Sequence, residues 1–92
     1  MPATVTDNQA LSRFELQVDG GVAFINYRRA ADQITLPHAE VPPQLSGKGI
    51  GTELARGTLD TLRVEGARVR IRCSFVAAFV ARHPEYQDIL DE

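Results

Sequence analysis

The spacing of apolar residues changes along this chain, and that change constrains the fold more than any other feature. Ahead of Pro42-Pro43, apolar residues alternate with polar ones, which is typical of strands that bury one face. From Ile50 to Glu65 they recur every three to five positions, which predicts an amphipathic helix ended by Gly66. Alternation returns over residues 68–73, and a short apolar helix follows over 75–82. Strands and helices must therefore share one core.

Three strands are predicted before the long helix. Residues 13–18 and 22–28 alternate on either side of Gly20-Gly21, which predicts a β-hairpin. Residues 33–41 predict a third strand, which ends at Pro42 because proline has no N–H to donate to a sheet. With the later elements, the predicted order is β-β-β-α-β-α.

The fold class that follows is α+β, an antiparallel β-meander joined to a β-α-β unit. A strand, a crossover helix and a second strand form a right-handed unit, so strands 33–41 and 68–73 are predicted to be parallel neighbours. Residues 1–11 show little periodicity and are predicted to be a flexible N-terminus. Residues 12–92 are predicted to form a single domain, in keeping with a chain of 92 residues.

Composition excludes several classes of protein. Hydrophobic residues make up 43% of the chain, too many for a disordered protein, yet the longest apolar run is too short to cross a bilayer. The single cysteine, Cys73, excludes an internal disulfide and a thiolate metal cage, and it fits a reducing cytoplasm. No metal site is predicted. The pI of 5.6 argues against nucleic acid, whereas seven Lys and Arg against three acids over residues 44–83 suit a small anionic ligand.

A glycine-rich segment lies between the third strand and the long helix. Gly47, Gly49 and Gly51 let a ligand approach the backbone, and the first helical N–H groups point at it with the positive end of the helix dipole. Lys48 adds a positive charge. The segment predicts phosphate binding, most simply of a diphosphate, although it matches neither a P-loop nor a Rossmann fingerprint. The alternative is a strand-to-helix turn without a ligand.

The same segment resembles the pyrophosphate-arm motif Q/R-x-x-G-x-G/A of the GNAT acetyltransferases, with Gln44, Gly47 and Gly49 in the three fixed places. Residues 38–42, 73–75 and 82–86 strengthen the resemblance, which extends over residues 12–90 and is to the minimal, single-domain branch of that superfamily. It implies a minimal GNAT fold in which acetyl-CoA lies where two parallel strands splay apart, here after Val41 and Cys73.

The resemblance also implies which residues hold the cofactor. The backbone near Val41 would pair with the pantetheine arm, the glycine-rich segment would hold the diphosphate, and two residues of the last helix would flank the cofactor. These positions are Val41, Gln44, Gly47, Lys48, Gly49, Ile50, Gly51, Thr52, Phe79 and Arg82.

Three residues are candidates for catalysis. His38 and Glu40 are two apart on a predicted strand and share one face, so either could take a proton from an incoming ammonium. Cys73 precedes a helix and follows three arginines, an environment that stabilises a thiolate. The resemblance implies that Cys73 acts at the transfer centre, as an acetyl-accepting nucleophile or as the acid that protonates the CoA thiolate. The alternative for all three is a structural or solvated role.

The resulting prediction is an acetyl-CoA-dependent N-acetyltransferase acting on an amine of a small molecule or protein. The chain lacks the additional segments that build the acceptor pocket in larger GNAT enzymes, so a partner protein could complete that site. The first alternative is a CoA-binding module without turnover, and the second is an interaction domain without a ligand. A monomer or weak dimer is expected.

Overall fold

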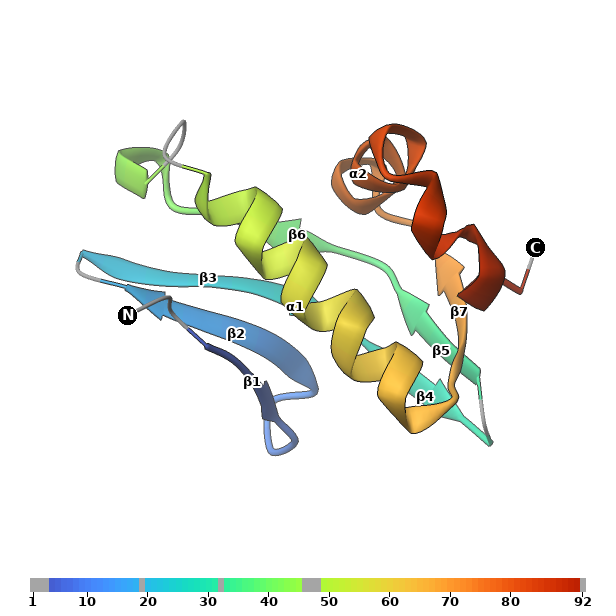
Figure 1. Ribbon diagram of the computed structural model, residues 1–92. Helices are drawn as coiled ribbons and strands as arrows, with labels where there is room; N and C mark the ends of the chain where they lie inside the picture. Colours follow the sequence, from blue (N-terminus) through green and yellow to red (C-terminus); the bar gives the residue numbers. More distant parts are fainter. Residues whose placement is uncertain (1–3, 19, 32, 46–48, 92) are drawn as a thin grey trace.

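The computed structural model describes residues 4–18, 20–31, 33–45 and 49–91. Helix α1 runs across the strands, and α2 and η2 lie beside it (Figure 1). The predicted α+β class is confirmed. In chain order the elements are β1 (Val5–Asn8), β2 (Arg13–Val18), β3 (Gly21–Asn26), β4 (Arg28–Ala30), β5 (Gln33–Leu36), β6 (Ala39–Glu40), η1 (Pro43–Leu45), α1 (Ile50–Glu65), β7 (Arg68–Ile71), α2 (Ser74–Arg82) and η2 (Pro84–Ile89).

The strands form two sheets, in the orders β1-β2-β3-β6 and β4-β5-β7. The pairing of β5 with β7 is parallel, from Gln33 opposite Arg68 to Leu36 opposite Ile71. The other strand pairs are antiparallel. The predicted parallel neighbours on either side of the crossover helix are therefore confirmed.

Two predicted strands are each divided between the two sheets. The strand predicted over residues 22–28 forms β3 and β4, with Tyr27 between them donating its N–H to the Ser12 carbonyl (2.9 Å). The strand predicted over 33–41 forms β5 and β6 and ends at Glu40. It breaks at Pro37, which has no N–H for a ladder. In both cases the prediction of one continuous strand was wrong.

The core lies between α1 and the strands. The apolar face of α1 contributes Leu54, Ala55, Leu59 and Leu62, each fully buried. Gly66 ends the helix in the left-handed region (φ 75°). Its N–H donates to the Arg63 carbonyl, and the N–H of the next residue donates to Leu62, which is a Schellman cap. The helix therefore has the bounds predicted from its periodicity. The facing strands contribute Phe14, Leu16, Ala23, Ile25, Ile34, Leu36 and Val69.

Strand β1 is a correction to the predicted flexible terminus. Val5–Asn8 pairs antiparallel with β2, with Val5 opposite Leu16. A glycine in the middle of α1 makes room for this strand, because a Cβ on Gly57 would lie 2.8 Å from the Val5 Cβ. The helix glycine, which costs about 1 kcal/mol of helix propensity relative to alanine, thus allows β1 and α1 to approach closely.

Replacing Gly57 with alanine is expected to destabilise the protein by about 1–2 kcal/mol despite the gain in helix propensity, because the added methyl displaces Val5. In a Val5→Gly background the same substitution meets no side chain at that position, and we expect it to stabilise by up to about 1 kcal/mol. Urea unfolding of the four proteins measures both values. A stabilising effect of Gly57→Ala in both backgrounds would contradict this account of the glycine.

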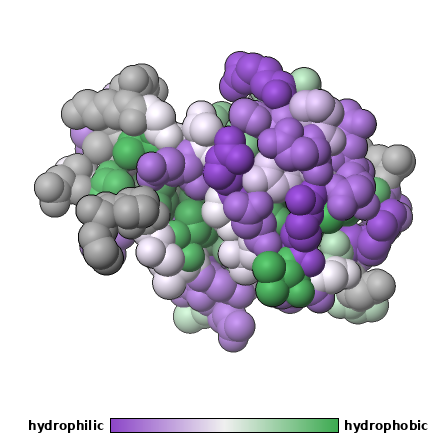
Figure 2. Space-filling model, in the orientation of Figure 1, coloured by the Kyte–Doolittle hydropathy of each residue, from purple (hydrophilic) through white to green (hydrophobic). Residues whose placement is uncertain are grey.

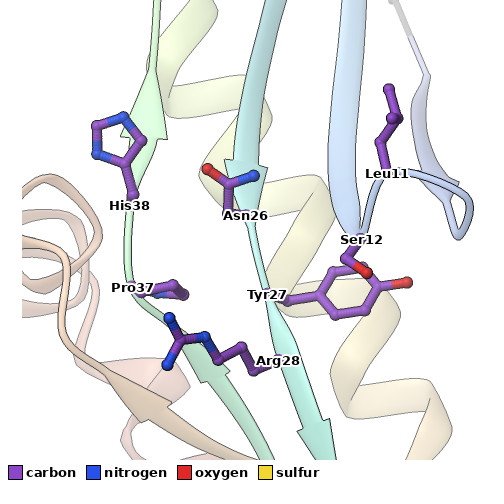
Figure 3. Close-up of a pocket in the computed structure, with 7 residues that line it drawn as sticks. All are labelled: Leu11, Ser12, Asn26, Tyr27, Arg28, Pro37 and His38. Atoms are coloured by element: carbon purple, nitrogen blue, oxygen red, sulfur yellow. The ribbon is translucent and has the colours of Figure 1, made fainter.

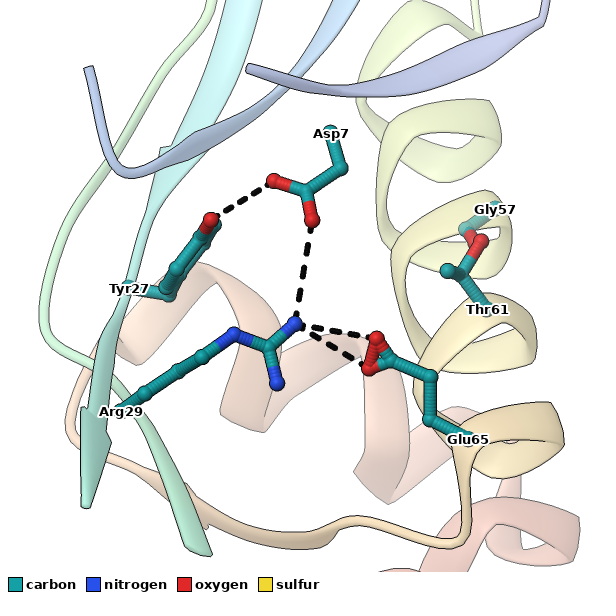
Figure 4. A network of polar contacts seen from close by, with 6 residues as sticks. All are labelled: Asp7, Tyr27, Arg29, Gly57, Thr61 and Glu65. Carbon is teal, nitrogen blue, oxygen red and sulfur yellow. Dashed lines mark hydrogen bonds and ion pairs between the residues drawn. The ribbon is translucent and has the colours of Figure 1, made fainter. Parts of the chain in front are cut away.

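Polar side chains connect β1, β4 and α1 at the C-terminal end of the helix. The Tyr27 hydroxyl donates to Asp7 (2.7 Å), and the Arg29 guanidinium lies between Asp7 (3.7 Å) and Glu65 (2.9 Å), as Figure 4 shows. Nearby on α1, the Thr61 hydroxyl donates to the Gly57 carbonyl (2.8 Å). These contacts hold β1 against the C-terminal half of α1.

Both tyrosines of the chain are buried and donate to carboxylates, Tyr27 to Asp7 and Tyr86 to Asp60. Burial, and next the hydrogen bond to the carboxylate, raises the pKa of each phenol above the ordinary 10.0. The unfolded chain ionises first, so the stability that these phenols contribute is complete below pH 10.0 and is lost as the pH rises through their folded pKa values. Phenolate absorbance of the native protein should therefore rise at higher pH than that of the urea-unfolded protein. Coinciding titration curves would contradict the burial and hydrogen bonding that raise the two pKa values.

The face of the first sheet away from α1 is only partly buried and combines charged side chains with Phe24. Glu15, Phe24 and Glu40 lie across from one another on β2, β3 and β6, on the side away from the buried Phe14 and Ile25. Seen from the α1 side, the surface is mostly hydrophilic, with hydrophobic residues in separate patches (Figure 2). Among the described residues, no helix is long and apolar enough to span a membrane.

Candidate functional site

The parallel strands β5 and β7 part at the position where the sequence predicts a ligand. Their pairing ends with Leu36 opposite Ile71, and one further hydrogen bond joins the Arg72 N–H to the Leu36 carbonyl (3.0 Å). Beyond Pro37, the chain pairs with β3 instead, while beyond Arg72 it enters α2. Ligands of open α/β sheets bind at the carboxyl ends of strands that diverge in this way.

Strand β6 has a free edge at this point. It is the last strand of its sheet, with β3 on its other side. Asn26 donates its N–H to the His38 carbonyl (2.8 Å), and Glu40 lies opposite Phe24 in the same register. Because backbone groups alternate along an antiparallel strand, those of Ala39 point to the free edge. A ligand lying along this edge could pair with the backbone.

The N-terminus of α1 is open to an anion. Gly49 precedes the helix in the left-handed region (φ 77°, ψ 5°), and among the described residues a Cβ there would meet no atom within 4 Å. Within the part of the chain that the structure describes, no side-chain hydrogen bond caps this end of the helix. The Glu53 N–H donates to the Gly49 carbonyl, so the N–H groups of Ile50, Gly51 and Thr52 precede the first helical bond. These donors fit a diphosphate.

Gly51 is packed against the first turn of α2. A Cβ on Gly51 would lie 2.6 Å from the Phe75 Cζ and 3.8 Å from the Val41 Cγ2. The fold thereby brings together Val41 and Gly51, both predicted to contact the cofactor. Phe75 belongs to this cluster as well and was not predicted as a site residue; the signal available in the sequence was its place directly after Cys73-Ser74.

His38 and Glu40 lie together as their spacing predicts. The His38 Nε2 is 2.9 Å from the Glu40 Oε2, and both side chains are exposed, at 57% and 61%. Val41, the next residue, contacts the α1 side, so the carboxylate of Glu40 and the side chain of Val41 lie on opposite faces of the chain. The free edge of β6 therefore borders both the α1 side and the open face of the sheet.

Cys73 precedes α2 in an extended conformation, and its carbonyl accepts the Ala77 N–H (3.0 Å). The thiol-bearing residue is 9% exposed. Arg82, in the last turn of α2, is exposed. Phe79 is only 2% exposed and stacks on His83, with ring centroids 4.3 Å apart. Its surroundings are those of a core residue, and its contact with the cofactor stays a prediction.

The remaining predicted positions lie in or beside the glycine-rich segment. Gln44 donates its amide to the Gly20 carbonyl in the β2–β3 turn (2.9 Å). Gly47 and Lys48 lie outside the described residues. No group of three or more metal-ligating side chains occurs in the part of the chain that the structure describes.

This arrangement of a divergent parallel strand pair facing an uncapped helix N-terminus is that of an acetyltransferase domain, and the chain belongs to the GCN5-related N-acetyl-transferase family, whose sequence model matches residues 13–89. The resemblance inferred from the sequence is therefore confirmed. The chain is 29% identical over 86 residues to the protein NATD1 of Bos taurus, covering 90% of this chain and 76% of that one. It is 27% identical to NATD1 of Mus musculus over 86 residues, with coverages of 90% and 78%.

A solved structure has the same fold. The solution structure of a GCN5-like protein from Staphylococcus aureus superposes with a TM-score of 0.72 and covers 96% of this chain and 87% of that one. The two sequences are 23% identical, so the likeness concerns the fold.

Proposed function

We propose that this protein transfers the acetyl group of acetyl-CoA to the amine of an acceptor. The observation that carries the proposal is the divergence of β5 and β7 directly before the open N-terminus of α1. The left-handed Gly49, with no described atom within 4 Å of its Cβ position, and the three amide donors that follow fit a diphosphate. The free edge of β6 fits a pantetheine arm, whose amides can pair with a strand.

Acetyl-CoA supplies an activated thioester, whose C–S bond is replaced by a C–N bond to the amine. An ammonium group must first lose a proton, because only the free amine has a lone pair for attack. The Glu40 carboxylate, held 2.9 Å from the His38 imidazole, accepts that proton on the open face. The exposed position of both side chains gives the proton a route to solvent.

Cys73 is proposed to act at the sulfur side of the reaction. It follows β7 by two residues and directly precedes α2. Its Sγ–H would donate the proton that the departing sulfur takes up, and the thiolate left on Cys73 would take up the second proton that the amine nitrogen loses as the amide forms. The backbone N–H groups along the β6 edge near Val41 would polarise the carbonyl.

Calorimetric titration with acetyl-CoA, with CoA and ATP as controls, tests the cofactor assignment. Release of free CoA in the presence of a panel of amines then tests turnover. We expect Glu40→Gln to lower turnover by about 100-fold or more without changing acetyl-CoA affinity, because general base catalysis contributes that much. Glu15→Gln is the matched control, a carboxylate of the same face that is already paired with Arg13.

The two alternatives have different outcomes in the same experiment. A CoA-binding module would bind acetyl-CoA and release no CoA with any amine. An interaction domain would not bind it even at millimolar concentration, and the proposal would then be wrong. Unchanged turnover in Cys73→Ala would remove Cys73 from the mechanism alone.

A further inference from the structure

A hollow of about 480 Å³ opens on the sheet face opposite α1, where both sheets bend. Figure 3 views it with α1 behind the strands. The volume is within the range of small-molecule sites. The hollow lies where β3 passes into β4 and β5 into β6, so it adjoins the point at which the parallel strands part. It is lined by Leu11, Ser12, Asn26, Tyr27, Arg28, Pro37 and His38.

The lining contains a cation and no carboxylate. The Arg28 guanidinium reaches toward Pro37 in Figure 3, and Arg28 is exposed. The neighbouring arginines differ, since Arg29 is paired with Glu65 and Arg13 with Glu15. Within the described residues no acidic side chain forms an ion pair with Arg28. Among the described residues, Arg28 is thus a positive charge at the hollow without an ion-pair partner.

The other end of the hollow reaches the proposed proton acceptor. His38 lines it and lies 2.9 Å from Glu40. Arg28 lies opposite Thr35, and Thr35 precedes His38 by three residues. The backbones of Arg28 and His38 are therefore roughly 10 Å apart along the strand direction. The long side chain of Arg28 can span part of this distance. One end of the hollow therefore favours an ammonium and the other an anionic group.

We propose that the acceptor is a small amino carboxylate, a primary amine with a carboxylate a few bonds away. Its carboxylate binds Arg28, with Ser12 and Asn26 as hydrogen-bond partners, and its amine lies at the His38–Glu40 pair. Leu11 and Pro37 contact the intervening carbons. This inference rests on the proposed function, since it names the acceptor of the same reaction.

The test measures binding without acetyl-CoA, by amide chemical shifts. The probes are glycine, β-alanine and 4-aminobutanoate, each against the amine that lacks its carboxylate: methylamine, ethylamine and propylamine. We expect at least one amino carboxylate to bind about tenfold or more tightly than its matched amine, with shifts at Asn26 and His38. Arg28→Gln should abolish the preference. Arg70→Gln, an exposed arginine on the neighbouring β7 that does not line the hollow, should leave it intact.

Equal binding of amines with and without the carboxylate, or a preference that survives Arg28→Gln, would overturn the inference. The outcome is separable from that of the proposed function. Acetyl transfer to amines without any advantage of the carboxylate would reject the amino carboxylate and retain the transferase. Arg28-dependent binding without any affinity for acetyl-CoA would retain the amino carboxylate site and reject the transferase.

Discussion

The Gly49→Trp variant is expected to lose acetyl-CoA affinity by at least about 100-fold, because the indole would lie over the α1 N-terminus, where no described atom is within 4 Å of the Cβ position, and block its amides. Hydrogen bonds to a charged group contribute about 1.5–3 kcal/mol each, so the loss of two reaches this size. The substitution also strains the left-handed backbone (φ 77°), at about 1–2 kcal/mol of folding stability. Calorimetry on the folded variant measures the affinity.

Gly66 at the other end of α1 offers a matched control for that strain. It has nearly the same conformation (φ 75°), and a Cβ there would also meet nothing within 4 Å. Gly66→Trp should therefore destabilise the fold similarly and leave acetyl-CoA binding unchanged. If both variants lose affinity equally, the loss reflects the strained fold and the diphosphate site is not at Gly49.

The Phe14→Ala variant is expected to lose about 4 kcal/mol of unfolding free energy, since Phe14 is fully buried beneath α1 and its ring lies 5.0 Å from that of Tyr27. This is a large part of the stability of a domain of this size. Phe24 is the matched control on the neighbouring strand. It faces the open side of the sheet, where the Arg13 guanidinium lies 4.2 Å from its ring.

We expect Phe24→Ala to cost only about 1 kcal/mol, because a half-buried ring leaves no enclosed cavity. Urea unfolding of both variants measures the difference. Equal losses would mean that the two faces of this hairpin are buried alike, which contradicts the one-sided core.

Much of this fold could be predicted because its signals are local. The apolar period of α1 and the glycine that ends it depend on residues within a few positions of one another. The missed features are tertiary. Strand β1 forms because it pairs with β2 and because Gly57 leaves room for Val5. A strand of four residues is too short for either feature to give a periodic pattern in the sequence.

The division of strands 22–28 and 33–41 between two sheets could not be predicted from the sequence pattern for a different reason. Buried positions alternate without interruption through Ala23, Ile25 and Tyr27, although β3 ends before Tyr27. Side-chain alternation records which face is buried and does not record which neighbour accepts each backbone hydrogen bond. The break at Pro37 has a cause that is visible in the sequence, because proline has no N–H for a ladder, but the predicted strand ended only at Pro42.

In the candidate site, too, the local feature could be predicted from the sequence and the tertiary one could not. The spacing of His38 and Glu40 predicted a shared face, and the structure has them 2.9 Å apart. The hollow around Arg28 could not be predicted, because it is assembled from the β1–β2 turn, the end of β3 and the β5–β6 break. Contacts between such distant segments depend on sheet curvature, which the sequence pattern does not specify.

The parallel pairing has a consequence for how the protein folds. Gln33 pairs with Arg68 although the whole of α1 lies between them in the sequence, whereas β2 and β3 are joined by a short turn. Closing the longer loop costs more entropy, so we expect the hairpins to form early and the β5–β7 contact to form late. The divergence that frames the ligand site begins where this contact ends. Ligand binding during refolding would then report the last step of assembly, and the site would be lost first when the chain begins to unfold.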